Sequence, residues 1–186
     1  MQAKRPQGFG LRTRLHHRSK GKLRPRSAGS AESSERAGLP SRRVANIIAV
    51  MRATGDFRVV SFEAAKLDPP PHAIATGLPV GVATMDKRYE GGVSGRSATI
   101  FTSAFDQARG IGTYVAMESF EGSLNALAGA FNFVHAATTS GSDRTHEHFL
   151  IVPSSGAGGL ASIRGSGGLT VDVDGKHEIW FEYELD

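Results

Sequence analysis

The chain contains no cysteine and no long apolar run, and both absences exclude classes of protein. Without cysteine it can hold neither a disulfide framework nor a thiolate zinc cluster, and redox chemistry does not indicate a compartment. We take the cytoplasm as the default location. No segment approaches the roughly 20 apolar residues that a membrane-spanning helix needs. We therefore expect no membrane partner, and nothing in the sequence predicts a cofactor.

Basic residues are concentrated at the N-terminus. Residues 1–43 contain 12 Lys and Arg against 2 acidic residues, whereas residues 44–186 contain 10 against 16. The basic segment has few apolar residues, so it cannot bury enough surface to offset the entropy of ordering it. We predict that residues 1–48 are disordered. Three explanations stay open: an over-long reading frame whose true start is Met51, an arm that binds polyanions, or a targeting segment.

From Met51 onward, apolar and polar residues alternate in short segments. Such period-two patterning with aromatic and β-branched residues predicts strands. The clearest examples are residues 51–62, 112–122, 129–136, 145–152 and 176–186. Turns rich in glycine, proline and Asp-Gly separate the segments. Residues 51–186 are therefore predicted to form one all-β domain of about eight short antiparallel strands, which lose their exposed edges by closing into a barrel.

The stretch SSGAGGLASIRG, residues 154–165, has the G-x-G-x-x-A spacing of a dinucleotide-binding loop. That fingerprint requires a strand before it, a helix directly after it and a βαβ unit around it. The residues that follow Gly158 instead hold four glycines within GLASIRGSGG, which leaves no helix. We predict a glycine-rich corner where strands bend at the rim of a barrel.

Three spaced motifs carry a resemblance to a known family. The pattern S-G-x-G-x-L-x-x-I-x-G-x-G is present as Ser155, Gly156, Gly158, Leu160, Ile163, Gly165 and Gly167. The pattern E-x-x-x-G-x-L before a Phe strand is present as Glu118, Gly122, Leu124 and Phe131. A closing D-G-x-H…Y pattern is present as Asp174, Gly175, His177 and Tyr183. Over residues 52–186 the sequence resembles the bacterial domain-of-unknown-function family 3224.

This resemblance implies a fold but no activity. The family is similar to the barrels of allene oxide cyclases and dirigent proteins, which bind apolar molecules inside. The implied fold is a closed eight-stranded antiparallel barrel, in agreement with the strand pattern.

Two ionisable residues stand on faces that are otherwise apolar. Glu118 alternates with Tyr114 and Phe120, and His135 follows aromatic residues in the next strand. Burial raises the pKa of a carboxyl group, and a nearby imidazole could exchange a proton with it. With Tyr183 as a hydrogen-bond donor, Glu118 and His135 could serve an isomerase or cyclase. The alternative is a buried hydrogen bond with a structural role only.

The predicted inward faces are rich in aromatic side chains, and the interior of such a barrel is wide enough for one small ligand. The residues that we expect to line a ligand site are Tyr114, Phe120, Phe131, Phe133 and Phe181. The sequence therefore predicts a barrel that binds a small apolar molecule. Two alternatives stay open: an enzyme that uses Glu118 and His135, and a filled barrel that acts through its surface or as an oligomer.

Other partners are supported less well. His146 and His148 share one strand face, as zinc ligands can, but an exposed polar face explains them more simply and we predict no metal. The basic residues of the domain, Lys87 and Arg144 among them, are scattered among acids. We therefore expect them on a solvated exterior that binds no nucleic acid. Trp180 alternates outward, which is the signal for a homo-oligomer contact.

Overall fold

A computed structural model of the chain describes residues 49–140 and 143–186, and these residues contain strands and turns but no helix. The predictions for residues 1–48 lie outside the described residues. The strands are β1 (Met51–Ala65), β2 (Val80–Gly91), β3 (Val93–Asp106), β4 (Ile111–Leu124), β5 (Leu127–Ser140), β6 (Arg144–Ile151), β7 (Ala157–Gly158), β8 (Arg164–Val171) and β9 (His177–Glu184). The all-β prediction is confirmed. Nothing in the described residues is a helix long and apolar enough to cross a membrane.

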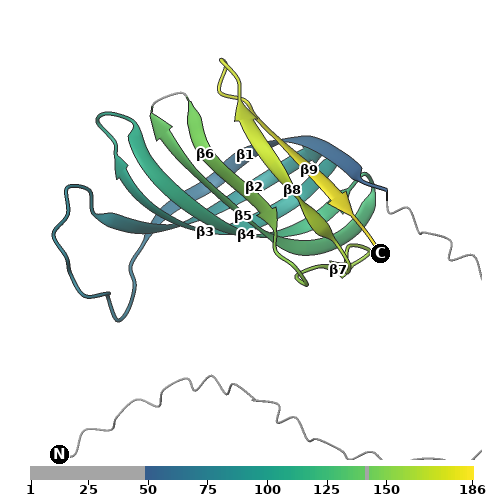
Figure 1. The fold of residues 1–186 in the computed structure, drawn as a ribbon, viewed down its shortest axis with the longest axis horizontal. Coiled ribbons are helices and arrows are strands. Elements are labelled where there is room, and N and C mark those ends of the chain that lie inside the picture. The colour runs from purple at the N-terminus through teal and green to yellow at the C-terminus, as the bar shows by residue number, and fades with distance from the viewer. Residues whose placement is uncertain (1–48, 141–142) are drawn as a thin grey trace, which may run out of the picture. The chain divides into compact units, whose positions relative to one another are not determined.

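Eight of the strands form a closed ring in which every neighbouring pair is antiparallel (Figure 1). Strands β1 to β6 pair in chain order, β6 then pairs with β8, β8 with β9, and β9 returns to β1. The short strand β7 pairs separately with one end of β5. Because the ring closes, none of its eight strands presents an unpaired edge over its whole length.

Two irregularities change which side chains face inward. In β1 the register with β2 shifts between Val59 and Ser61, which inserts one extra residue into β1. In β6 the register with β5 shifts in the same way near His146, which has a positive φ of 53°. Such bulges bend a strand and re-aim the side chains that follow.

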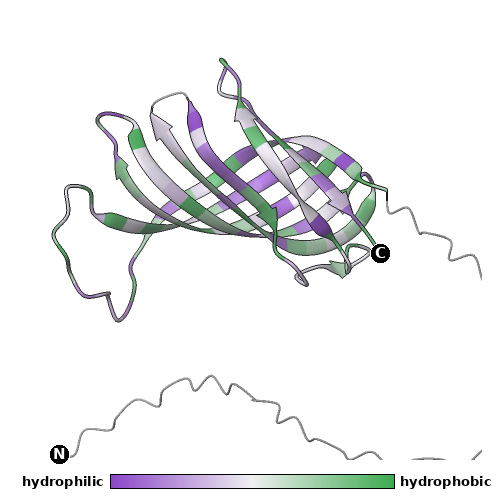
Figure 2. Cartoon of the chain, viewed as in Figure 1, coloured by the Kyte–Doolittle hydropathy of each residue, from purple (hydrophilic) through white to green (hydrophobic). Residues whose placement is uncertain are grey.

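Buried and more exposed residues otherwise alternate along the strands, and hydrophilic and hydrophobic residues are interspersed along the ribbon (Figure 2). The predicted inward sets of β4, β5 and β9 are buried as expected, with Phe120, Phe133 and Phe181 each 2 % exposed or less. Aromatic rings fill one end of the ring in edge-on and tilted contacts, for example Phe131 against Phe181 at 5.2 Å between ring centroids. This cluster forms the hydrophobic core of the protein.

The glycine-rich segment 154–165 closes the filled end of the ring. It makes turns and the short strand β7, as predicted for a corner, and inserts Leu160 and Ile163 into the core at 0 % and 2 % exposure. A side chain at Gly156 would overlap the carbonyl oxygen of Leu160, so only glycine fits this close approach. The motif therefore has a structural role in covering the core.

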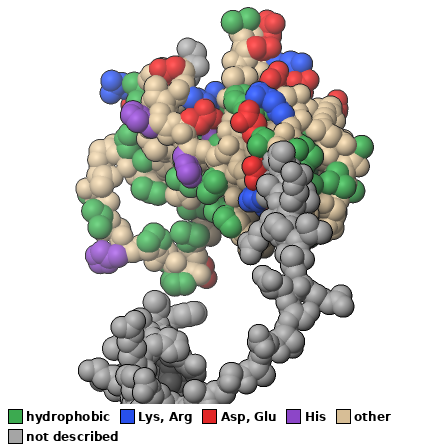
Figure 3. All heavy atoms as spheres, turned by 45° about the vertical axis from the view of Figure 1, so that its right-hand side comes forward, with side chains coloured by type: hydrophobic (Ala, Val, Ile, Leu, Met, Phe, Trp, Pro, Cys, Tyr) green, Lys and Arg blue, Asp and Glu red, His purple; other side chains and the backbone are tan. Residues whose placement is uncertain are grey.

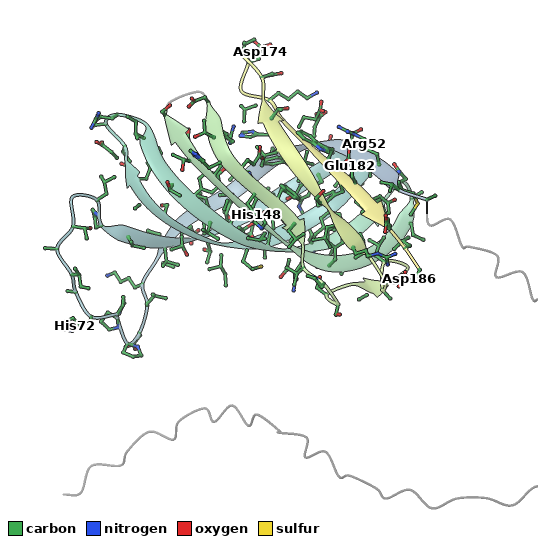
Figure 4. All side chains as sticks on the ribbon, viewed as in Figure 1. Arg52, His72, His148, Asp174, Glu182 and Asp186 are labelled. Atoms are coloured by element: carbon green, nitrogen blue, oxygen red, sulfur yellow. The ribbon has the colours of Figure 1, made fainter. Side chains whose placement is uncertain are left out.

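The outside of the ring is charged on one side and apolar on another. On β1 and β9, Arg52 and Glu182 point toward each other and form an ion pair of 2.8 Å (Figure 4). Arg52 also lies over the half-buried ring of Trp180, 5.4 Å from its centroid. Across β3 to β6, a row of apolar side chains stands in register: Ile100, Met117, Val134 and Leu150. Homo-oligomer formation stays a prediction.

Candidate functional site

The end of the ring opposite the glycine-rich corner contains a cavity of about 530 Å³. Ligand sites typically have volumes of about 300–1,000 Å³. Its wall comes from β1 to β6, β8 and β9, so the cavity lies inside the ring. Figure 3 shows hydrophobic side chains beside the hollow between the ring and the projecting loop that joins β1 and β2.

One part of the cavity wall is apolar and comes from the ends of β1, β2 and β3. Phe62 lies 5.5 Å from Phe101 between ring centroids, in an edge-on contact, and is paired with Met85 in the β1–β2 register. Phe101 in turn stacks on Tyr114 of β4 at 5.2 Å. Phe62 is 55 % exposed, so this aromatic surface is open to solvent. Strict alternation from Ala53 would place Phe62 on the outside, and the bulge after Val59 brings it inward.

A buried carboxylate network lies between the cavity and the filled core. Glu118 of β4 is 0 % exposed and accepts hydrogen bonds at both oxygens. Lys87 Nζ donates to Oε2 at 2.6 Å, Ser97 Oγ donates to Oε1 at 2.6 Å, and the Tyr89 hydroxyl also donates to Oε1. Burial, and then the charge of Glu118, raise the pKa of Tyr89 well above its usual range. A buried carboxylate is tolerated only with such a complete set of donors.

The position of Lys87 contradicts the sequence prediction. It was expected on the solvated exterior, but the residue is 7 % exposed, and its ammonium lies 4.9 Å from the centroid of the Phe57 ring. The signal that sequence reasoning missed is alternation within β2, which places Lys87 with Met85 and Tyr89 on one face. The physical reason for its burial is the Glu118 carboxylate, which neutralises it.

A second polar chain runs along the cavity wall through His135 of β5. Arg144 Nε donates to the Tyr114 hydroxyl at 3.3 Å, and that oxygen lies 3.4 Å from His135 Nδ1. His135 Nε2 lies 2.9 Å from Glu147 Oε1. A neutral imidazole with its proton on Nε2 satisfies every contact, because it donates to the carboxylate and accepts from the tyrosine. Arg144 was also expected outside, and it lines the cavity.

The two histidines of the cavity wall are held in the neutral form. Burial lowers the pKa of His135 to about 4 against the opposing effect of Glu147, and Lys87 and Arg144 lower it further. The pKa of His177 is also lowered, mainly by burial and then by Arg144 and Lys87. His177 packs against Phe57 in a tilted contact, with 4.8 Å between the ring centroids. Burial likewise raises the pKa of the Tyr114 hydroxyl.

The residues predicted as a catalytic set share no hydrogen bond within the part of the chain that the structure describes. The hydrogen-bond partners of Glu118 within the described residues are Lys87, Tyr89 and Ser97, whereas those of His135 are Tyr114 and Glu147. Tyr183 lies in the filled core, opposite Met51 and Gly165 in the strand register. Glu118 and His135 are therefore inward-facing neighbours on the paired strands β4 and β5 with separate hydrogen-bond networks, and Tyr183 belongs to the core cluster.

The predicted ligand-lining residues are divided between the two ends of the ring. Tyr114 lines the cavity. The other predicted residues pack in the filled core, where each is 2 % exposed or less: Phe120, Phe131, Phe133 and Phe181. The cavity is lined instead by residues that sequence reasoning had not selected, chiefly Phe62, Phe101, Phe105 and Met85.

The His-x-His pair lies on the outer face of β6, where His146 and His148 are both exposed. Glu147 between them faces the other way and contacts His135. Within residues 49–140 and 143–186, no three His, Asp or Glu side chains are grouped as a metal site requires. The weak zinc alternative therefore has no third ligand in this part of the chain.

Comparison with known proteins is informative at the level of the family. The profile of the family described as "Protein of unknown function (DUF3224)" matches residues 53–183. The chain belongs to this family. A crystal structure of a DUF3224 protein of unknown function from Shewanella oneidensis MR-1 is 27 % identical in sequence, with a TM-score of 0.62. The alignment covers 74 % of this chain and 99 % of that one. No curated protein matches.

Membership of the DUF3224 family agrees with the resemblance found in the sequence. The matched region begins at Ala53 of β1 and ends at Tyr183 of β9, so it includes all eight strands of the ring and the glycine-rich corner. The cavity and both polar networks lie within it. The family description gives no activity, so function has to be argued from the site.

Proposed function

We propose that the ring is a barrel of the allene oxide cyclase and dirigent type, and that its open half binds a small, largely apolar molecule. The observation that supports this most strongly is the unequal filling of the two ends. One end is packed with aromatic rings beneath Leu160, whereas the other holds about 530 Å³ of space with a mainly apolar wall. A barrel that acted only through its surface would have no need for this space, because packed interiors hold few large voids.

Binding is favoured over catalysis by the state of Glu118. Both of its carboxylate oxygens already accept hydrogen bonds, from Lys87, Tyr89 and Ser97, and the residue has no exposed surface. A general base must reach the proton that it removes, within hydrogen-bond distance or through one water. A carboxylate held in this way is better suited to keeping Lys87 in place than to attacking a substrate.

A fluorescent probe and one pair of tryptophan variants test the proposal. N-phenyl-1-naphthylamine is neutral and apolar, and its emission rises when it leaves water. Ala83 is 6 % exposed and lines the cavity, so Ala83→Trp should fill the space. Ala98 is on the outer face of β3, and Ala98→Trp is the matched control.

The proposal expects saturable binding of the probe to the full chain. Ala83→Trp should weaken binding at least about tenfold, a loss of about 1.4 kcal/mol, whereas Ala98→Trp should bind as the parent chain does. Circular dichroism and the melting temperature establish that both variants are folded. Absence of saturable binding, or equal binding to a folded Ala83→Trp variant, would contradict the proposal.

A further inference from the structure

The charged side chains that line the cavity are all of one sign. Among the described residues of the cavity wall these are Lys87 and Arg144, and neither Asp nor Glu is present. The carboxylates that balance them lie behind the wall: Glu118 is completely buried and Glu147 is turned toward His135. A molecule inside the cavity therefore meets the cations directly and the carboxylates only at a distance.

Both cations also have N–H donors that make no hydrogen bond within the described residues. An ammonium group has three N–H donors, and Lys87 uses one of them on Glu118 Oε2 within the part of the chain that the structure describes. Its ammonium is almost buried, so few waters can reach the other two. Arg144 uses Nε on the Tyr114 hydroxyl, and among the described residues its terminal N–H groups have no hydrogen-bond partner. The buried donors of Lys87 in particular are normally satisfied by an acceptor.

The carboxylates and the His135 imidazole near these donors already have partners. Glu118 accepts from three side chains, and Glu147 receives the His135 contact. His135 Nδ1 faces the Tyr114 hydroxyl. The described polar part of the wall therefore has no negatively charged acceptor that faces the cavity. The apolar part of the wall is a surface formed by Phe62, Phe101 and Met85.

From this arrangement we infer that the ligand is a monocarboxylate with an apolar body, whose carboxylate is bound by Lys87 and Arg144 and whose body lies against Phe62 and Phe101. The inference rests on the proposed function and adds the chemical class of the ligand. His135 and His177 lie within electrostatic range of both cations and are neutral at physiological pH, so neither histidine changes the net charge of the cavity wall. Positive charge in a low-dielectric pocket attracts an anionic head group.

Three probes that share one alkyl tail but differ in head group test the carboxylate inference separately from the proposed function. Decanoate, 1-decanol and decylamine are titrated into the full chain by isothermal calorimetry at neutral pH, below the concentrations at which they aggregate. Decanoate should bind at least about tenfold more tightly than 1-decanol, since a charge-assisted hydrogen bond contributes more than a neutral one. Decylamine should bind most weakly, because its ammonium would lie beside Lys87.

Variants then test the two named cations. Arg144→Gln should reduce the preference for decanoate over 1-decanol at least threefold, without weakening 1-decanol. Arg96→Gln removes an exposed arginine from the outside of β3, where it pairs with Glu121, and is the matched control. Lys87→Met alone leaves Glu118 without its cation, so the double variant Lys87→Met/Glu118→Gln is the second test and should lose most of the remaining preference.

The outcomes distinguish the two claims. Equal binding of decanoate and 1-decanol would overturn the carboxylate inference and leave the apolar cavity as a binding site. A preference for decanoate that survives in both the Arg144→Gln and the double variant would overturn the assignment to these residues. Failure of all three probes to bind would overturn the proposed function itself.

Discussion

Lys87 Nζ lies 2.6 Å from Glu118 Oε2, although the two residues belong to β2 and β4 and a whole strand separates them. Ser97 of that intervening strand, β3, donates to the other Glu118 oxygen. The ion pair thus spans three strands at the boundary between the packed end of the ring and the cavity. It fixes one of the two cations of the proposed site.

Breaking this pair from one side should be strongly destabilising. Lys87→Met leaves the Glu118 charge buried without its cation, and we expect a loss of about 3–5 kcal/mol in the free energy of unfolding. Lys87→Met/Glu118→Gln removes both charges and should recover most of that loss. Urea unfolding compares the free energies of unfolding of the parent chain and both variants. The control is Arg96→Met, which breaks an exposed ion pair and should cost less than about 1 kcal/mol. A single variant no worse than the double variant would contradict the account.

Stability should fall as the pH is lowered through the range set by His135. The folded pKa of about 4 lies below the ordinary value of 6.5, so between these values the unfolded chain binds more protons than the folded one. Stability is therefore complete above about pH 6.5 and decreases toward pH 4, by at most about 3 kcal/mol from this residue. His177 acts in the same direction.

The contribution of His135 is isolated by comparison with a variant that cannot titrate. His135→Gln keeps a donor and an acceptor for Glu147 and Tyr114 but has no charged form. As the pH falls from 7.5 to 4.5, the melting temperature of the parent chain should fall relative to that of His135→Gln, because only the parent has a group at this position that must stay neutral in the folded state. Parallel curves over the whole range would show that His135 is not responsible.

The glycine-rich corner should be essential for stability and not for ligand binding. Leu160 is fully buried at the end of the ring opposite the cavity. Leu160→Ala should cost about 2–5 kcal/mol, since it leaves a void among the core aromatics. Binding of N-phenyl-1-naphthylamine to the folded fraction should be unchanged. A variant with parental stability, or with loss of binding while folded, would contradict the division of the ring into two ends.

The turn between β4 and β5 is a place where the protein can be made more stable. Asn125 and Ala126 both have positive φ, of 47° and 71°, as in a two-residue hairpin turn that favours Asn-Gly. Ala126 is exposed, so removing its methyl group loses little packing. Ala126→Gly should raise the free energy of unfolding by about 0.5–1 kcal/mol, because it relieves the left-handed strain. Thermal melting measures this, and a lower melting temperature would count against the turn conformation.

Much of the fold could be predicted from alternation alone. The inward residues of β4, β5 and β9 were assigned correctly, because a period of two fixes which face is buried in a regular strand. Alternation could not have placed Phe62, because a bulge in β1 reverses the faces after Val59 without any glycine or proline to mark it. The prediction failed at Lys87, whose burial depends on a carboxylate far away in the sequence.

The site was harder to predict because alternation says nothing about depth along the ring. Phe120 and Phe133 face inward just as Tyr114 does, yet they fill the core and Tyr114 lines the cavity. Which end is filled depends on Leu160 and Ile163, which reach the core from a corner outside the ring of strands. The networks of Glu118 and His135 likewise depend on cross-strand partners that their sequence neighbours do not reveal.

A crystal structure of the full chain grown with ω-bromodecanoate tests the central claim most directly, because the anomalous signal of bromine locates the apolar end of the ligand. The account predicts a bromine peak inside the ring beside Phe62 and Phe101, with the carboxylate within hydrogen-bond distance of Lys87 Nζ or the Arg144 guanidinium. A bromine peak only on the outer surface, or a cavity occupied by rearranged side chains, would contradict it.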